Sequence, residues 1–167
     1  MTDWATSRRK FSAIISGGLG LAVLGISNPA FAKDSALPVP TSLPEVAKQA
    51  FAKGEPLVLL ISLPGCPYCE RVRRSYLLPG RRDADLQAWQ LSVTDSTRPL
   101  TGFDGKPTTA TAQVKLWKAT FTPTVLFLGP KGQELAERLV GAAIPDFYGA
   151  YLDERLITAR KVLLALR

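Results

Sequence analysis

The sequence predicts an α/β fold with a mixed sheet of four strands, flanked by helices on both faces, and with an extra helix at its N-terminal side. Three observations carry this prediction. Short apolar runs alternate with segments of helical periodicity, in the order α-β-α-β-α-β-β-α. A helical segment joins the first two strands, as in a parallel crossover, whereas a turn joins the last two. The apolar share of 46% is enough to form a core in a chain of 167 residues.

Residues 1–32 are predicted to be a secretory signal peptide rather than part of this fold. The basic head Arg8–Lys10 precedes an uncharged apolar stretch over 11–26, and residues 30–32 (Ala-Phe-Ala) have the small-x-small pattern of a cleavage site. The apolar stretch is shorter than the ~20 residues that span a bilayer. Residues 7–11 (Ser-Arg-Arg-Lys-Phe) also resemble the twin-arginine export motif, with the general secretory route as the other option. An uncleaved N-terminal anchor is the alternative to cleavage.

Cleavage after Ala32 changes both the length and the charge of the chain. Residues 1–32 carry three basic side chains and one acidic one, so 21 basic and 14 acidic residues become 18 and 13, a net charge of +5 instead of +7. Three prolines lie between residues 33 and 44. Residues 33–41 are therefore expected to form a flexible, extended leader before a domain over residues 42–167.

The domain is predicted to begin with a helix that is capped by Ser42. Ser42 and Glu45 have the spacing of a capping box, and Pro44 falls in the first turn, where a proline is tolerated. Gly54 ends the helix. The unbroken apolar run over 56–61 then predicts a strand that is buried on both faces.

The remaining elements are predicted from apolar periodicity between breaks at Pro and Gly. They are, in chain order, a helix to about Leu78 that Pro79-Gly80 closes, a helical turn over 83–88, a strand over 89–94, a polar loop over 95–107 and a helix over 108–119. The C-terminal part is predicted to form a strand over 123–128, a hairpin turn over 129–132, a strand over 134–140 and a helix from Pro145.

The composition excludes several classes of site. The chain has no His, which rules out Ser-His-Asp and Cys-His catalysis and any metal held by His. Two Cys supply neither a disulfide framework nor the four thiolates of a structural zinc site. The positive charges are scattered and belong to no nucleic-acid-binding motif. We therefore expect neither a metal nor a nucleic acid among the ligands.

Cys66 and Cys69 form a Cys-x-x-Cys motif between the predicted buried strand and the following helix. A Cys in the first turn of a helix faces unpaired N–H groups and the positive end of the helix dipole, and both stabilise the thiolate, the reactive form of Cys. Cys69, one turn further in, can attack a mixed disulfide formed at Cys66, and Pro67 stiffens the peptide between them. Half of a metal site shared by two chains, or two inert thiols, are the alternatives.

Over about residues 42–165 the chain resembles the thioredoxin superfamily. The resemblance is carried by four segments: Leu57–Ile61, Gly65–Cys69, Phe121–Phe127 and Leu139–Ala142. Together with the Thr-Pro-Thr pattern, the long loop that contains Phe103–Lys106 is most similar to exported bacterial thioredoxin-like proteins. The group associated with sulfur oxidation is the nearest of these. The Cys-Pro-Tyr-Cys tetrapeptide itself is typical of glutaredoxins.

The resemblance implies a thioredoxin fold and adds substrate-binding residues to the two cysteines. In that family a cis-proline faces the Cys-x-x-Cys motif, and Thr122-Pro123 occupies the matching place, although an ordinary trans-proline that opens a strand also fits the sequence. The backbone before such a proline is free to pair with an extended substrate. Gly141 matches a glycine where a side chain would crowd the substrate groove, and a plain turn is its alternative. The substrate-binding residues implied are Pro67, Tyr68, Thr122, Pro123 and Gly141.

The chain also departs from the family pattern. Gly65 stands where thioredoxins have Trp before the first Cys. Leu60 stands where they have a buried Asp that is thought to assist proton transfer. Residues 141–144 (Gly-Ala-Ala-Ile) lack the Gly-Gly-acidic motif with which glutaredoxins bind glutathione. A glutathione-dependent mechanism is therefore not favoured.

Charged residues follow the second cysteine. Glu70 is expected to be a solvated residue of the first helical turn, although its charge could raise the pKa of a neighbouring thiol. A basic rim of Arg71, Arg73 and Arg74 could lower the pKa of Cys66 or attract acidic partners. The alternative is that these three residues form an ordinary solvated helix face.

These observations predict an exported, periplasmic thiol–disulfide oxidoreductase that acts on protein disulfides or dithiols as a reductant. Cys66 is the expected nucleophile and Cys69 the resolving cysteine, and no cofactor is expected beyond the redox-active disulfide that they form. A membrane or periplasmic thiol is expected to restore the electrons. The alternatives are a non-catalytic binding or regulatory module and a glutathione-linked enzyme.

Overall fold

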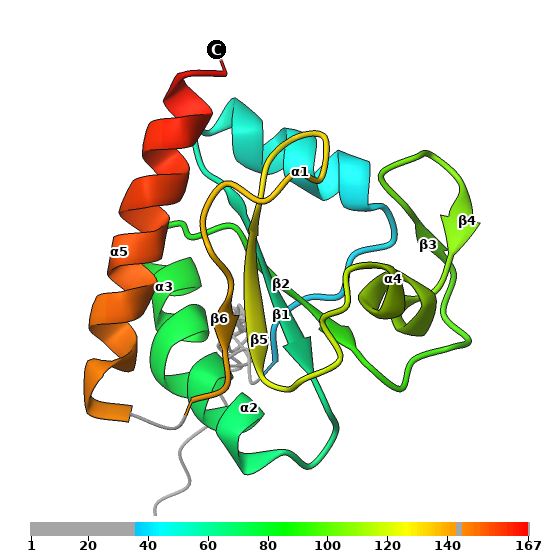
Figure 1. The fold of residues 1–167 in the computed structure, drawn as a ribbon, viewed down its shortest axis with the longest axis horizontal. Helices are drawn as coiled ribbons and strands as arrows, with labels where there is room; N and C mark the ends of the chain where they lie inside the picture. Colours follow the sequence, from blue (N-terminus) through cyan, green and yellow to red (C-terminus); the bar gives the residue numbers. More distant parts are fainter. Residues whose placement is uncertain (1–35, 143–144, 167) are drawn as a thin grey trace, which may run out of the picture. The chain divides into compact units, whose positions relative to one another are not determined.

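A mixed sheet of four strands forms the centre of the fold (Figure 1). The structure, a computed structural model, describes residues 36–142 and 145–166, which belong to one compact unit of the chain. In chain order the elements are α1 (Leu43–Ala52), β1 (Leu57–Ser62), α2 (Pro67–Val72), the π-helical turn η1 (Arg73–Leu77), α3 (Leu78–Asp83), β2 (Ala88–Ser92), β3 (Leu100–Thr101), β4 (Pro107–Thr108), α4 (Ala110–Leu116), β5 (Thr124–Leu128), β6 (Leu139–Val140) and α5 (Pro145–Leu164).

The strand order is β2-β1-β5-β6, which confirms the predicted mixed sheet. β1 is parallel to β2 and antiparallel to β5, and β6 pairs antiparallel with β5. All six residues of β1 are buried, as its unbroken apolar run predicts. Because β1 is an inner strand, the loop that follows its C-terminal end lies next to the start of its neighbour β5 (Figure 1).

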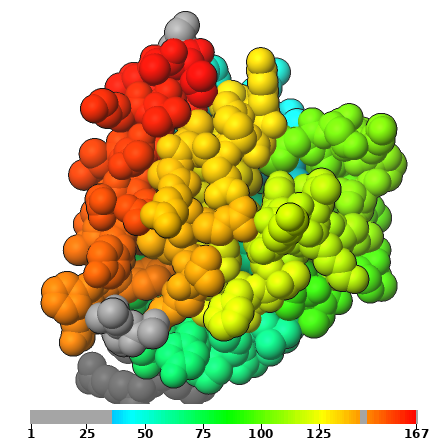
Figure 2. Space-filling view, viewed as in Figure 1, coloured from blue at the N-terminus to red at the C-terminus, as the bar shows by residue number. Residues whose placement is uncertain are grey.

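The side chains of β1 alternate between two apolar clusters, one on each face of the sheet. Val58 and Leu60 pack in the cluster that contains α5 and the helix after β1, whereas Leu59 and Ile61 pack in the cluster that contains α1 and α4. This is the period of two that a strand imposes on its side chains. Helices therefore cover both faces, as predicted, and the space-filling view shows the chain after β5, in yellow and orange, filling the surface beside α5 (Figure 2).

Helix α1 begins as the capping residues predict. The side-chain oxygen of Ser42 accepts a hydrogen bond from the N–H of Glu45 at 3.4 Å, and Pro44 lies in the first turn. Residues 36–41, which we expected in a flexible leader, pack against the fold. Leu37 is buried in the core, and the carbonyl of Pro38 accepts a hydrogen bond from the N–H of Gln90 at 3.0 Å.

The predicted end of the second helix at Pro79-Gly80 is wrong. The helix continues from α2 through the π-helical turn η1 into α3, which ends at Asp83. Pro79 lies in the first turn of α3, directly after the π-helical turn, whose wider hydrogen-bond spacing accommodates a residue that has no N–H to donate. The helical turn predicted over 83–88 is consequently absent, and Ala88 already belongs to β2.

Two further predictions need correction. The polar loop over 95–107 contains β3, which pairs antiparallel with β4, and the helix predicted over 108–119 is shortened to α4, capped by Thr109. Of the strand predicted over 134–140, only β6 and an isolated bridge from Glu134 to Leu128 form. Between them, Arg138 pairs with Glu134 and donates to the carbonyl of Trp117 at 2.9 Å, a contact outside the sheet.

The predicted signal peptide lies outside the described residues. In residues 36–142 and 145–166, no helix combines the length and the apolarity needed to cross a membrane.

The packing of Leu37 can be tested by Leu37→Ala. Leu37 is 2% exposed, so truncation leaves a cavity, and we expect the free energy of unfolding to fall by about 2–5 kcal/mol. Leu116, 75% exposed, is the matched control, and Leu116→Ala should change stability by less than about 0.5 kcal/mol. Urea unfolding of the full chain measures both, and equal stabilities of the two variants would show that residues 36–41 do not pack.

Candidate functional site

Cys66 is the residue that starts α2. Its sulfur accepts a hydrogen bond from the N–H of Cys69 at 3.2 Å, which satisfies one of the free donors of the helix end, and Pro67 is the first residue of the helix. Gly65 has φ +74°, a backbone conformation that favours glycine, and it turns the chain from the loop after β1 into α2. The sequence predicts Cys66 in the first helical turn, whereas the structure places it at the N-cap.

The two thiols differ in exposure. Both are free, but Cys66 is partly exposed and Cys69 is fully buried. A large partner can therefore reach the sulfur of Cys66, whereas Cys69 can react only with a group already bound at Cys66. This is the division of roles expected of a nucleophilic and a resolving cysteine.

The same environment separates the acidities of the two thiols. Burial raises the pKa of Cys66, but hydrogen bonds from the thiol and N–H of Cys69, from the Thr122 hydroxyl and from the N–H of Tyr68 outweigh it, so the pKa lies below its ordinary value. Burial, the hydrogen bond to Cys66 and the charge of Cys66 together raise the pKa of Cys69. The thiol of Cys66 is therefore the more acidic of the two.

Thr122 and Pro123 lie against the cysteine pair. The Thr122 side chain lies close enough to both thiols to favour the thiolate form of each through its effect on the pKa, and the Thr122–Pro123 peptide bond is cis, as the resemblance implied. The carbonyl of Pro123 accepts a hydrogen bond from the N–H of Gly141 at 2.7 Å. The start of β5 and the end of β6 therefore meet at the start of α2, on the lower edge of the fold in Figure 1.

The backbone conformation at position 141 requires a glycine, although the protein leaves space for a side chain there. Its φ is +77°, and a Cβ added there would meet no atom within 4 Å. Such a Cβ would project into open space beside Pro123. The open space agrees with the expected groove, in which a side chain would crowd only a bound partner.

The exposed residues of the motif complete the surface around Cys66. Pro67 is exposed, and Tyr68 is half exposed, as expected for a flat apolar contact. The guanidinium carbon of Arg71 lies 5.7 Å from the centroid of the Tyr68 ring, within the range of a cation–π interaction. All seven residues predicted for the site therefore lie at the same end of the sheet, where β1 ends and β5 begins.

The three arginines after the motif do not form one rim. Arg73 is buried, and it donates to Gln90 at 2.8 Å, to Ser62 at 3.4 Å and to the carboxylate of Glu70. Arg74 pairs with the other carboxylate oxygen of Glu70 at 3.2 Å. The hydrogen bonds named above, and not an arginine charge, lower the pKa of Cys66.

Sequence reasoning missed two features of the site. It gave Thr122 only a backbone role, whereas the hydroxyl contacts both sulfurs. It also missed that Arg73 ties α2 to β1 and β2. The spacing of Glu70 to Arg73 and Arg74 indicates helical ion pairs, but burial of Arg73 depends on Gln90, which the sheet register places beside Leu60.

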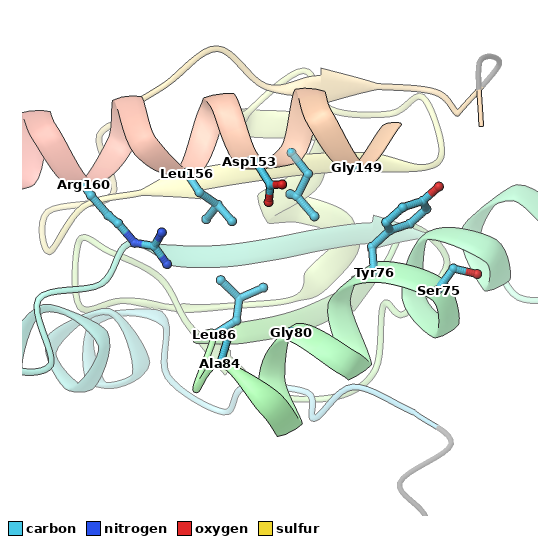
Figure 3. A pocket seen from close by; sticks show the side chains of 10 residues that line it. Ser75, Tyr76, Gly80, Ala84, Leu86, Gly149, Asp153, Leu156 and Arg160 are labelled. Atoms are coloured by element: carbon cyan, nitrogen blue, oxygen red, sulfur yellow. The ribbon is translucent and has the colours of Figure 1, made fainter. Parts of the chain in front are cut away.

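The described residues contain no second site of thiol chemistry. Among them, no group of three or more Cys, Asp and Glu side chains is placed to hold a metal ion. A cavity of about 320 Å³ lies between α3 and α5, with Leu86 and Leu156 in its lining and Asp153 and Arg160 beside them (Figure 3). Neither cysteine lines this cavity.

Comparison with known proteins identifies the family. A family model described as a thioredoxin-like domain matches residues 43–155. The chain belongs to this thioredoxin-like family. The match begins at the first residue of α1 and ends within α5, so it covers the whole sheet of the thioredoxin-like domain.

Several solved structures are similar to this thioredoxin-like chain at low identity. Poplar thioredoxin h, PtTrxh4, is 20% identical, over 66% of this chain and 85% of its own, with a TM-score of 0.46. Mitochondrial thioredoxin 3 from Saccharomyces cerevisiae is 17% identical, over 72% and 93%, with a TM-score of 0.47. The periplasmic thioredoxin SoxS from Paracoccus pantotrophus is 23% identical, over 61% and 96%, with a TM-score of 0.42. No curated protein matches the chain.

The buried arginine can be tested by Arg73→Met. The substitution removes the donor to Gln90 and Ser62 and one of the two arginines that pair with Glu70, so we expect a loss of about 1–3 kcal/mol in the free energy of unfolding. Arg74→Met removes an exposed ion pair from the same carboxylate and should cost less than about 1 kcal/mol. Urea unfolding compares the two, and a larger loss in Arg74→Met would contradict the assigned burial.

The pH dependence of Cys66 can be tested by Thr122→Val. Because the pKa of Cys66 is lowered, its alkylation by iodoacetamide should reach half its maximal rate at a lower pH than that of a free Cys peptide. Removal of the Thr122 hydroxyl takes away one donor to the thiolate and should move this midpoint to higher pH. Thr120→Val, at an exposed threonine nearby, is the control that should not move it. An unchanged midpoint in Thr122→Val would refute the contact.

Proposed function

We propose that the protein is an exported thiol–disulfide oxidoreductase that acts on protein disulfides through Cys66 and Cys69. One observation carries the proposal: a partly exposed cysteine of lowered pKa stands at a helix start, beside a buried cysteine of raised pKa. Membership of the thioredoxin-like family supports it. A metal site or a pair of inert thiols would not require this division of exposure and acidity.

In the reducing direction the chemistry has two steps. The Cys66 thiolate attacks one sulfur of a client disulfide, the client S–S bond breaks, and the released client thiolate takes a proton from solvent. Cys69 then loses its proton and attacks the sulfur of Cys66, which breaks the mixed disulfide and releases the second client thiolate. Two electrons pass to the client, and the protein is left with a disulfide between Cys66 and Cys69.

Thr122 is suited to hold the client during these steps. Its hydroxyl lowers the pKa of both thiols, so by turning it can donate to the thiolate of Cys66 in the first step and to that of Cys69 in the second. Among the described residues, its backbone N–H and carbonyl form no backbone hydrogen bond. These groups are therefore available to pair with an extended client strand beside Cys66.

The finer parts of the proposal are the compartment and the direction. Export is supported by the basic head, the apolar stretch and the Ala-Phe-Ala pattern of residues 1–32. We place the protein in the periplasm as a reductant, recharged by a membrane or periplasmic thiol, in the manner of exported bacterial thioredoxin-like proteins. Neither a metal nor an organic cofactor takes part in the proposed reaction.

Reduction of insulin tests the activity. The full chain should turn over repeatedly with dithiothreitol as electron donor, and Cys66→Ser should lower the rate to that of dithiothreitol alone. Cys69→Ser should release little product, because the mixed disulfide is not resolved. Undiminished turnover in Cys66→Ser, or no turnover of the unmodified chain with any thiol donor, would overturn the proposal, and the second result would favour a binding module.

N-terminal sequencing tests export. In a bacterial host, the chain recovered from the periplasm should begin at Lys33, because cleavage is expected after Ala32. If the twin-arginine route is used, replacing Arg8 and Arg9 by Lys should retain the chain in the cytoplasm. A periplasmic chain that still begins at Met1 would contradict cleavage, and a chain found only in the cytoplasm would contradict export.

A further inference from the structure

Four exposed apolar side chains belong to the segments that form the site. Leu63 and Tyr68 lie on the segment of Cys66, and Phe121 and Val140 lie on the segments of Thr122 and Gly141. The carbonyl of Leu63 accepts a hydrogen bond from the N–H of Cys66, and Tyr68 lies between the two cysteines. Phe121 directly precedes Thr122, and Val140 directly precedes the Gly141 that binds Pro123. Tyr68 is 52% exposed and Phe121 is 70% exposed, so the segments that carry Cys66 and Thr122 also present large apolar side chains to solvent.

The segment after Tyr68 carries an unneutralised positive charge. Both oxygens of the Glu70 carboxylate are occupied, one by Arg73 and the other by Arg74. Arg71 is exposed and lies over the ring of Tyr68, and in the described part of the chain it forms no ion pair. The single carboxylate of α2 thus leaves the guanidinium of Arg71 free to bind an external anion at the edge of the Tyr68 ring.

From this arrangement we infer the class of client, on the basis of the function proposed above. The client is a polypeptide with an acidic residue close to the reacting cysteine and an apolar residue next to it. The acidic side chain pairs with Arg71, and the apolar side chain lies between Tyr68 and Phe121. Clients with a basic residue in that position are disfavoured.

The chemistry of the Arg71 guanidinium supports a client with a carboxylate at this position. A guanidinium binds a carboxylate through two parallel N–H···O bonds, and here the Tyr68 ring limits the orientations that Arg71 can take. A lysine on the client would meet the same charge without a carboxylate to offset it. The apolar neighbours remove some water from the pair, which strengthens an electrostatic contact that is weak in open solvent.

Three peptides that differ at one position test the inference. Each contains a disulfide, an apolar residue and, beside the reacting Cys, either Glu, Gln or Lys. The rate of reduction by the reduced full chain is divided by the rate with dithiothreitol, which removes differences in intrinsic reactivity. We expect the Glu peptide to be reduced about two to five times faster than the Gln peptide, and the Lys peptide to be slowest. The differences should vanish in about 1 M salt, where the Debye length is ~3 Å.

Variants assign the preference to its residues. Arg71→Gln should abolish the order of the three peptides, and Arg71→Glu should reverse it. Arg82→Gln is the matched control, because Arg82 lies on α3 and is paired with Asp83, and it should keep the order. Phe121→Ala should slow all three peptides alike. Alkylation of Cys66 by uncharged iodoacetamide, measured in each variant, separates changes of recognition from changes of thiol reactivity.

The outcomes distinguish this inference from the function on which it rests. Equal relative rates for the three peptides, or an order that persists in Arg71→Gln, would overturn the client class and leave the oxidoreductase assignment standing. If the protein reduces none of the peptides, the proposed function itself fails and the inference fails with it.

Discussion

The hydrogen bond from the N–H of Cys69 to the sulfur of Cys66 is the contact on which the site depends. It makes Cys66 the cap of α2, so the helix starts at the nucleophile and directs its free N–H groups toward the sulfur. The same bond is among those that lower the pKa of Cys66, and it sets Cys69 one turn away in the core. In a chain without His, backbone groups and the hydroxyl of Thr122 provide this activation.

The position of this cap is determined by the sheet. β1 is an inner strand with both faces buried, so the loop that ends in Gly65 starts at the end of a central strand. β5 runs antiparallel to β1 and therefore begins at the edge where β1 ends, which places Thr122 and Pro123 against the cysteines. The short strand β6 adds Gly141 to the same edge. The site is thus assembled from segments that are far apart in the chain and that only the strand register brings together.

The parts predictable from the sequence are those that depend on local patterns. The run over Leu57–Ile61, the capping pair at Ser42 and the Cys-x-x-Cys motif at the helix start each depend on neighbouring residues, and all three are confirmed. The errors arise where tertiary contacts outweigh local signals. The burial of Arg73 against Gln90 and Ser62 accompanies a helix that continues past Pro79 through a π-helical turn, and Arg138 contacts Trp117 where the last predicted strand is interrupted. The hydroxyl of Thr122 and the burial of Arg73 depend on register, which no local pattern contains.

The central claim is that Cys66 attacks and Cys69 resolves, and the most direct measurement is to trap the state between these two steps. Cys69→Ser removes the resolving thiol, so in cells the full chain should accumulate as mixed disulfides that mass spectrometry assigns to Cys66. The double variant Cys66→Ser/Cys69→Ser should recover none of these partners. If the double variant recovers the same proteins as Cys69→Ser, the partners are held without covalent chemistry, and the assignment of Cys66 as the nucleophile is contradicted.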